Sequence, residues 1–124
     1  MEFDAAAVAA EVRAEFDGYE AALAANDVAA LVGYFWDSPA AMRMMTEGGL
    51  YGIEEIAAFR KGRDMADMER ELTRVTVLPL SPEVAVATAE YRRLGSGRRG
   101  SQTQVWLRRP EGWRIASAHV SLGA

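Results

Sequence analysis

Apolar residues near the start of the chain recur with the spacing of an α-helix. Five of them follow one another at steps of four, four, three and four and therefore share one helix face: Val8, Val12, Phe16, Tyr19 and Leu23. Asn26 ends this pattern, and Asp27 is a good N-cap for a second helix that runs through Phe35. The Ser38-Pro39 pair ends the second helix, because the residue before a proline avoids helical angles.

Strand patterns and turn residues dominate the rest of the chain. The apolar residues 40–46 predict a short strand, and Gly48-Gly49 allows a sharp turn after it. A third helix starts at Ile53 and stops within residues 62–65. Four longer strands follow, separated by clusters of turn residues: 71–80, 84–94, 101–109 and 113–122. Helices followed by a run of strands predict one α+β domain, residues 1–124, with three N-terminal helices on one face of a mainly antiparallel sheet.

The last of these strands has no clear solvent face. Strict alternation places Trp113, Ile115, Ser117, His119 and Ser121 on one side and the residues between them on the other. A half-exposed antiparallel sheet normally alternates more cleanly between apolar and polar residues. We therefore expect a second copy of the chain to cover the outer face of the sheet in a C2 homodimer.

Length and composition narrow the class of protein. A chain of 124 residues that is 50% hydrophobic and 26% charged is typical of one globular domain. It has no cysteine and one histidine, so we expect no disulfide, no thiol nucleophile and no metal site within one chain. The N-terminus lacks the pattern of a signal peptide, and no apolar run approaches the about 18 residues of a membrane span. We therefore expect a cytoplasmic protein without a membrane partner.

Charge is distributed unevenly along the chain. Residues 1–71 carry six basic and fifteen acidic residues, whereas residues 72–124 carry eight arginines and three glutamates. An acidic half before an arginine-rich half is compatible with nucleic-acid binding. The chain as a whole is acidic, with a net charge of −4, and has no dense basic run with interleaved aromatic residues. We therefore expect solvated helices and an arginine-studded sheet, and no nucleic-acid partner.

Two residues are the first candidates for chemistry. Arg43 interrupts an otherwise apolar strand, and a buried arginine must meet a carboxylate or an anionic ligand, or point out of an edge. An internal pair with Glu47 or Glu90 is one alternative, and two-point contact with a ligand carboxylate is the other. Tyr19 lies on the apolar face of the first helix. Its hydroxyl could bond a backbone carbonyl, or exchange a proton with a ligand at the floor of a pocket.

Seven further residues are candidates for lining such a pocket. They are Arg60 and Arg63 near the end of the third helix, Glu90 and Arg92 on one strand, Gln102 and Gln104 on the next, and His119 on the last. The two arginines also suit a solvated helix end, where the helix dipole favours cations. The histidine has an unperturbed pKa near neutrality, but a single histidine on a strand is more commonly a structural hydrogen-bonding group. The methionines favour a role as core or pocket filler.

Several short motifs along nearly the whole chain carry a family resemblance. They are Phe16-Asp17-Gly18-Tyr19-Glu20-Ala21-Ala22-Leu23, Asn26-Asp27, Tyr34-Phe35-Trp36, Arg43, Leu50-Tyr51-Gly52, Ile56, Phe59-Arg60 with Arg63, Gln102, Gln104-Val105-Trp106, Glu111-Gly112-Trp113-Arg114-Ile115 and Ala118-His119-Val120-Ser121-Leu122. Each motif is weak alone. In this order they resemble the AtzH-like subfamily (oxalurate-catabolism associated, dicarboxyurea-hydrolase-like) of the NTF2-like, or SnoaL-like, superfamily.

The resemblance implies a cone of helices on a curved sheet that encloses a small-molecule pocket. It further implies hydrolysis of a small carboxylated urea or amide, with Tyr19 and Arg43 as the working residues and without a metal or another cofactor. Arg43 would hold a substrate carboxylate and polarise the adjacent carbonyl, and Tyr19 would move a proton or orient water. No Ser-His-Asp order is recognisable, so a covalent serine route is not expected.

The chain departs from the family pattern after Arg43. The family usually has a glycine two positions on and a Glu-Asn pair before Leu-Tyr-Gly, whereas this chain has Met45, Gly48 and Gly49. This loss of polar groups favours a larger or less polar ligand. Two alternatives therefore stay open: an isomerase, cyclase or dehydratase that uses Tyr19 with Glu90 or His119, and a ligand-binding or accessory subunit without turnover.

Overall fold

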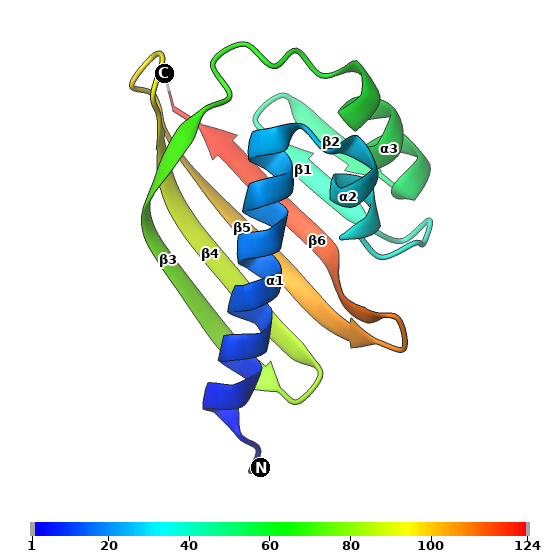
Figure 1. Ribbon diagram of the computed structural model, residues 1–124. Coiled ribbons are helices and arrows are strands. Elements are labelled where there is room, and N and C mark those ends of the chain that lie inside the picture. Colours follow the sequence, from blue (N-terminus) through cyan, green and yellow to red (C-terminus); the bar gives the residue numbers. More distant parts are fainter. Residues whose placement is uncertain (1, 124) are drawn as a thin grey trace.

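The helices and strands follow the predicted order. The computed structural model describes residues 2–123. Its helices are α1 (Ala5–Ala25), α2 (Val28–Gly33) and α3 (Ile53–Gly62). Its strands are β1 (Met42–Met45), β2 (Gly48–Tyr51), β3 (Arg70–Ser81), β4 (Val84–Arg93), β5 (Arg99–Arg109) and β6 (Gly112–Leu122). Figure 1 shows the three helices on one side of a curved sheet, which confirms the predicted α+β class.

Side-chain caps determine where the first two helices begin. The carboxylate of Asp4 accepts a hydrogen bond from the Ala7 amide at 3.0 Å, and that of Asp27 accepts one from Ala30 at 3.1 Å. Asn26 adopts the left-handed conformation, with φ of 50°, that ends α1. The second helix ends earlier than predicted, at Gly33, because the chain then turns to form a bridge with β6.

The six strands form one sheet in the order β2-β1-β6-β5-β4-β3. All neighbours are antiparallel except β1 and β6, which are parallel. Three small residues on the inner face of β4, Ala85, Ala87 and Ala89, are fully buried and allow α1 to pack closely on the sheet. The large core residues Phe16, Phe35, Ile56 and Trp106 fill the space between helices and sheet. None of the helices in residues 2–123 has the length and apolar character of a membrane span.

The sequence interpretation is wrong at the first hairpin. Gly48 and Gly49 were expected to form the turn, but they belong to β2, where they pair with Met45 and Met44. The turn is formed by Thr46 and Glu47 instead. Two glycines without side chains gave no strand signal, so this short strand was missed.

The alternation of the last strand also changes partway along. Val105 of β5 faces Ser117, but the next residue, Trp106, faces Ile115, so one extra residue bulges out of β6. Trp113 and Ile115 are buried under the helices, and Ala118 is buried on the same side, one position out of phase. Every residue after the bulge therefore faces opposite to the strict alternation that the sequence analysis assumed.

Candidate functional site

A small internal cavity lies between α1, the end of α3 and the inner face of the sheet. Five of the predicted site residues line it: Tyr19, Arg43, Arg60, Arg63 and Gln102. Arg70, Tyr91 and Arg93 complete its polar wall. The cavity volume is about 20 Å³, which is room for about one water molecule. Five arginines therefore converge on a space that no acidic residue lines.

Arg43 reaches the cavity from the centre of β1. Its position opposite Ala118 of β6 turns the side chain inward, and only 3% of the residue is exposed. The guanidinium carbon lies 4.9 Å from the centre of the Phe59 ring, a cation–π contact. Its Nε and Nη1 atoms are buried and have no hydrogen-bond partner among residues 2–123. Burial, together with the nearby Arg60 charge, lowers the pKa of Arg43 to about 10.

Arg60 and Tyr19 form a buried pair. Arg60, in the last turn of α3, donates a hydrogen bond from Nη2 to the hydroxyl of Tyr19, which projects from the apolar face of α1. The two residues are 3% and 4% exposed. The Nε and Nη1 atoms of Arg60 are also buried without a partner in the described part of the chain. The tyrosine hydroxyl thus bonds a cation and not a backbone carbonyl.

Arg63 lines both this cavity and a neighbouring one of about 90 Å³, which Met45, Glu47 and Phe59 also line. It follows the last residue of α3, and its guanidinium carbon lies 5.0 Å from the centre of the Phe59 ring. Burial, with Arg60 nearby, lowers the pKa of Arg63 to about 10. Of the three departures from the family pattern, Met45 therefore lies at the site, whereas Gly49 lies against the sulfur of Met44 on the outer face.

A hydrogen-bonded network at the opposite wall was not predicted. Arg70 of β3 forms an ion pair with Glu20 at 2.5 Å and donates to the Gln102 side chain at 2.9 Å. Its guanidinium carbon lies 4.3 Å from the centre of the Tyr91 ring. Nothing in the sequence marks Glu20 and Arg70, which are 50 residues apart, as partners; only the packing of α1 on the sheet brings them together. Glu20 offsets the charge of Arg70 but not those of Arg43 and Arg60.

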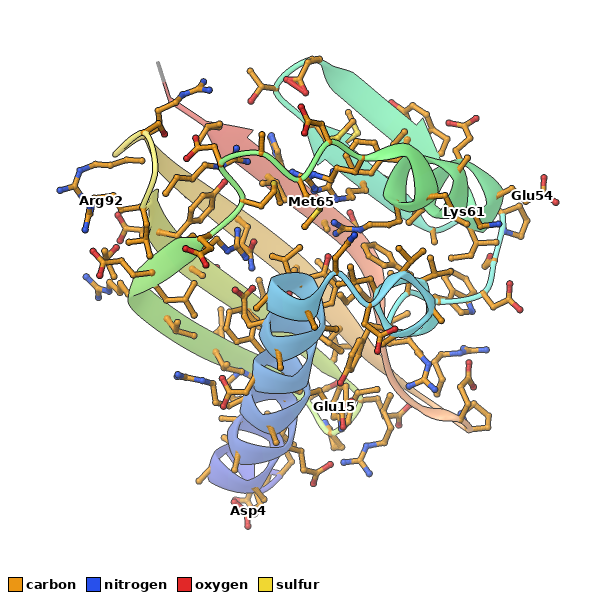
Figure 2. All side chains as sticks on the ribbon, turned by 45° about the horizontal axis from the view of Figure 1, so that its top comes forward. Asp4, Glu15, Glu54, Lys61, Met65 and Arg92 are labelled. Carbon is orange, nitrogen blue, oxygen red and sulfur yellow. The ribbon has the colours of Figure 1, made fainter. Side chains whose placement is uncertain are left out.

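Arg93 has a weaker ion pair at the edge of the site. Its Nη1 atom lies 4.0 Å from a carboxylate oxygen of Asp67, on the segment that joins α3 to β3. The other oxygen of Asp67 accepts the Ser96 amide at 2.9 Å, and hydrogen bonding to Ser96 lowers the pKa of this carboxyl group. Figure 2 shows the same segment, marked by Met65, crossing in front of the sheet. Asp67 thereby fastens the segment that carries Arg63 to the turn between β4 and β5.

The other four predicted residues do not reach the cavity. Glu90 and Arg92 were expected to line the cone, but both point to the outer face of the sheet, where Arg92 pairs with Glu71 at 2.6 Å. In Figure 2, Arg92 lies at the edge of the molecule, away from Met65. The bulge in β6 turns His119 outward as well, and its side chain is exposed. Gln104 faces inward but lies deeper in the core, where its oxygen accepts the Trp106 indole N–H at 3.1 Å.

The arrangement suits an anion. Guanidinium groups with buried, unused N–H donors offer two-point binding to a carboxylate. Residues 2–123 contain no cluster of histidine, cysteine or acidic residues that could hold a metal ion. Arg43 also forms no ion pair with Glu47 or Glu90. Of the two alternatives for Arg43, the geometry therefore favours an anionic ligand.

Comparisons with known proteins agree on the family and the fold. The family model described as AtzH-like matches residues 1–124. A crystal structure of a protein of unknown function from the DUF3225 family of Pectobacterium atrosepticum has 45% sequence identity and a TM-score of 0.91, covering 96% of this chain and 93% of that one. A cystatin-like fold protein from Burkholderia xenovorans has 34% identity and a TM-score of 0.87, with coverage of 94% and 92%.

A more distant solved structure shares the fold. An NTF2-like superfamily protein from Salmonella enterica has 24% identity and a TM-score of 0.78, covering 96% of this chain and 93% of that one. At this identity the likeness shows the fold alone. Among curated proteins, none matched the chain.

Proposed function

Because the chain belongs to the AtzH-like family, we propose that it hydrolyses a C–N bond in a small carboxylated urea or amide. The observation that carries this proposal is the buried guanidinium of Arg43, which has unused donors and no carboxylate partner among residues 2–123. Removing a charge from water costs several kcal/mol unless a counter-charge is near. A ligand carboxylate would supply that counter-charge.

Arg43 and Tyr19 would divide the chemistry. Arg43 would bind the carboxylate in two-point contact and draw electron density from the adjacent carbonyl. The oxygen of a water molecule would add to that carbonyl carbon, and the C–N bond would then break. Tyr19 would give its phenolic proton to the departing nitrogen and recover one from the added water. Both side chains line the same cavity, as this route requires.

Substrate entry requires movement of side chains, because a carboxylated urea is larger than a cavity of about 20 Å³. Arg63 lines both this cavity and the one of about 90 Å³, and it forms no ion pair within residues 2–123. Arg43, Tyr91, Arg93 and Val120 line both spaces as well, so the two cavities share a wall that a moving Arg63 side chain would open. We infer that the substrate enters past Arg63, where the arginine-rich wall attracts an anion.

The test is hydrolysis by the purified protein of dicarboxyurea and allophanate, followed as release of ammonia and carbon dioxide, and of oxalurate, followed as release of urea and oxalate. We expect turnover that falls by at least about 100-fold in Arg43→Ala and Tyr19→Phe, a typical loss for a group that acts in the transition state. Arg99→Ala is the matched control, because this arginine is exposed at the start of β5. Absence of turnover from folded protein on all three compounds would refute hydrolysis.

A non-hydrolytic enzyme of the same fold is the second candidate. The apolar side chains of Met45 and Phe59 beside the arginines favour a less polar ligand for such an enzyme. The expected partners of Tyr19 in acid–base chemistry, Glu90 and His119, lie on the other face of the sheet. Exchange of a ligand C–H proton with deuterated water, without ammonia release, would favour this candidate, and tight binding without either reaction would favour an accessory subunit.

A further inference from the structure

We propose that Arg60 is a positioning residue: it orients the Tyr19 hydroxyl toward the cavity and acts on the ligand through it. The inference deepens the proposed hydrolysis and rests on it for the identity of the reaction. It departs from the expectation that Arg60 binds substrate directly.

The hydrogen bond fixes the direction of the phenolic proton. Arg60 Nη2 donates and the Tyr19 oxygen accepts, since a guanidinium has no acceptor atom. The hydroxyl must therefore direct its own proton elsewhere. The rings of Tyr34 and Phe35 flank Tyr19 edge-on, with centroids at 5.8 and 6.4 Å, and within residues 2–123 neither side chain forms a hydrogen bond with the Tyr19 hydroxyl. The remaining side is the cavity, so the proton points at the space where a ligand would bind.

Arg60 is held rigidly enough for this role. It lies in the last turn of α3, is 3% exposed, and its guanidinium carbon is 5.8 Å from the centres of both the Tyr19 and Phe59 rings. No carboxylate in residues 2–123 forms an ion pair with it. Its full charge is therefore available to the phenolic oxygen.

This charge matters most when the proton leaves. As Tyr19 donates its proton to the departing nitrogen, negative charge develops on the phenolic oxygen. The bond from Arg60 then becomes a charge-assisted hydrogen bond between a cation and an anion, which is stronger than the bond to the neutral phenol. This additional stabilisation appears in the transition state and is lost when the added water returns a proton to Tyr19.

A double-mutant cycle separates this role from direct binding. The variants are Arg60→Met, Tyr19→Phe and their combination, with kcat and KM for oxalurate as the readout. If Arg60 acts through Tyr19, Arg60→Met lowers kcat by about 100-fold in the native background but by less than about 3-fold in Tyr19→Phe. Equal losses in both backgrounds would overturn the proposal, because Arg60 would then act on the ligand itself.

Arg63→Met is the matched control, because Arg63 also lines the cavity but forms no hydrogen bond with Tyr19. Arg63→Met should change kcat by the same factor in the native protein and in Tyr19→Phe. Thermal unfolding of every variant identifies losses that come from misfolding. Arg60→Lys gives a milder second test, because it keeps the charge. A kcat above that of Arg60→Met in the native background, but not in Tyr19→Phe, supports the proposal.

A second readout does not depend on turnover. In protein with ¹⁵N-labelled arginine, Tyr19→Phe should shift the side-chain signals of Arg60, whereas Tyr34→Phe should leave them in place. Unmoved Arg60 signals in Tyr19→Phe would overturn the proposal. If none of the three compounds is hydrolysed, the hydrolase proposal fails separately, and the Arg60 signals in Tyr19→Phe still decide whether Arg60 is coupled to the Tyr19 hydroxyl.

Discussion

At the scale of single residues, the buried arginines oppose the stability of the fold. Arg43 is 3% exposed and has no carboxylate partner in the described part of the chain. Burial lowers its pKa from the ordinary arginine value to about 10. A cation whose pKa is lower in the folded state destabilises that state at every pH at which it stays charged. Arg43 thus lowers the stability of the ligand-free protein while it completes an anion site. Such a side chain is more readily explained by function than by packing.

The first prediction concerns stability. Arg43→Met should raise the free energy of unfolding of the ligand-free protein by about 1–3 kcal/mol, because an apolar chain of similar length replaces a buried, unpaired charge. The same variant should lose measurable affinity for oxalurate. Urea unfolding and calorimetric titration measure the two effects, with Arg99→Met as the exposed control. A destabilised Arg43→Met would show that the guanidinium supports the fold.

The second prediction follows from the same pKa and concerns pH. Arg43 and Arg63 are charged at neutral pH and lose their protons as the pH rises through about 10. Affinity for oxalurate should therefore be constant near pH 7–9 and fall at higher pH. The stability penalty from Arg43 is fully present below pH 10 and is relieved above it. Calorimetric titrations from pH 7 to 11 check the first effect, and undiminished affinity at pH 11 would contradict it.

Sequence reasoning found some of these residues and missed others for a physical reason. Arg43 and Tyr19 interrupt or join apolar patterns within a single element, so their inward direction follows from local periodicity. The pair of Glu20 and Arg70 depends on how α1 crosses β3, which local periodicity does not contain. The absence of a partner for Arg43 could not be predicted either, because Glu47 and Glu90 were both plausible partners.

At the scale of whole elements, the ends of the strands were predicted well. The face of the sheet to which each side chain points was predicted less well. Turn residues mark the ends of β3, β4, β5 and β6 to within about two residues. A single bulge in β6 nevertheless reverses the direction of His119, because a shift of one residue exchanges the two faces of a strand. The sequence around the bulge, Ile115-Ala116-Ser117, contains neither glycine nor proline to mark it.

The third prediction concerns the packing of α1 against the chain that follows α2. A Cβ atom at Gly18 would lie 2.2 Å from the Tyr34 hydroxyl oxygen, and Tyr34 in turn packs edge-on against Tyr19. Gly18→Ala should therefore destabilise the protein by about 1–2 kcal/mol, although alanine favours a helix by about 1 kcal/mol over glycine. The displaced Tyr34 should also reduce turnover through Tyr19.

The control for this prediction is Gly33→Ala in α2. A Cβ atom there would meet no atom within 4 Å, so the substitution should be neutral or slightly stabilising. Thermal and urea unfolding of both variants give the comparison. Equal stability of Gly18→Ala and the native protein would mean that Tyr34 moves aside without cost.

At the scale of the whole molecule, the two faces of the sheet differ in what covers them. The helices cover the inner face, as Figure 1 shows, and the outer face has no covering element within residues 2–123. A row of aliphatic residues crosses this outer face through directly paired positions on three strands, Leu78, Val86 and Val105. Leu78 is 55% exposed. A polar row of Thr76, Thr88 and Thr103 lies on one side of it, and Val84, paired with Leu107, lies on the other.

The last prediction is that this face is the contact surface of a homodimer. An aliphatic patch with a polar row along one side can meet its own copy across a twofold axis, because the same patch serves both subunits. Such an interface would have to bury about 800 Å² on each subunit to be stable. Light scattering at micromolar concentration should therefore give twice the mass of the chain. Leu78→Glu should give the mass of one chain, since it places two like charges in the interface without disturbing the core. Leu94→Glu, at a leucine 47% exposed outside the row, should remain dimeric. A native protein that is monomeric in this measurement would refute the interface, and the outer face would then be a solvent-exposed surface of the sheet.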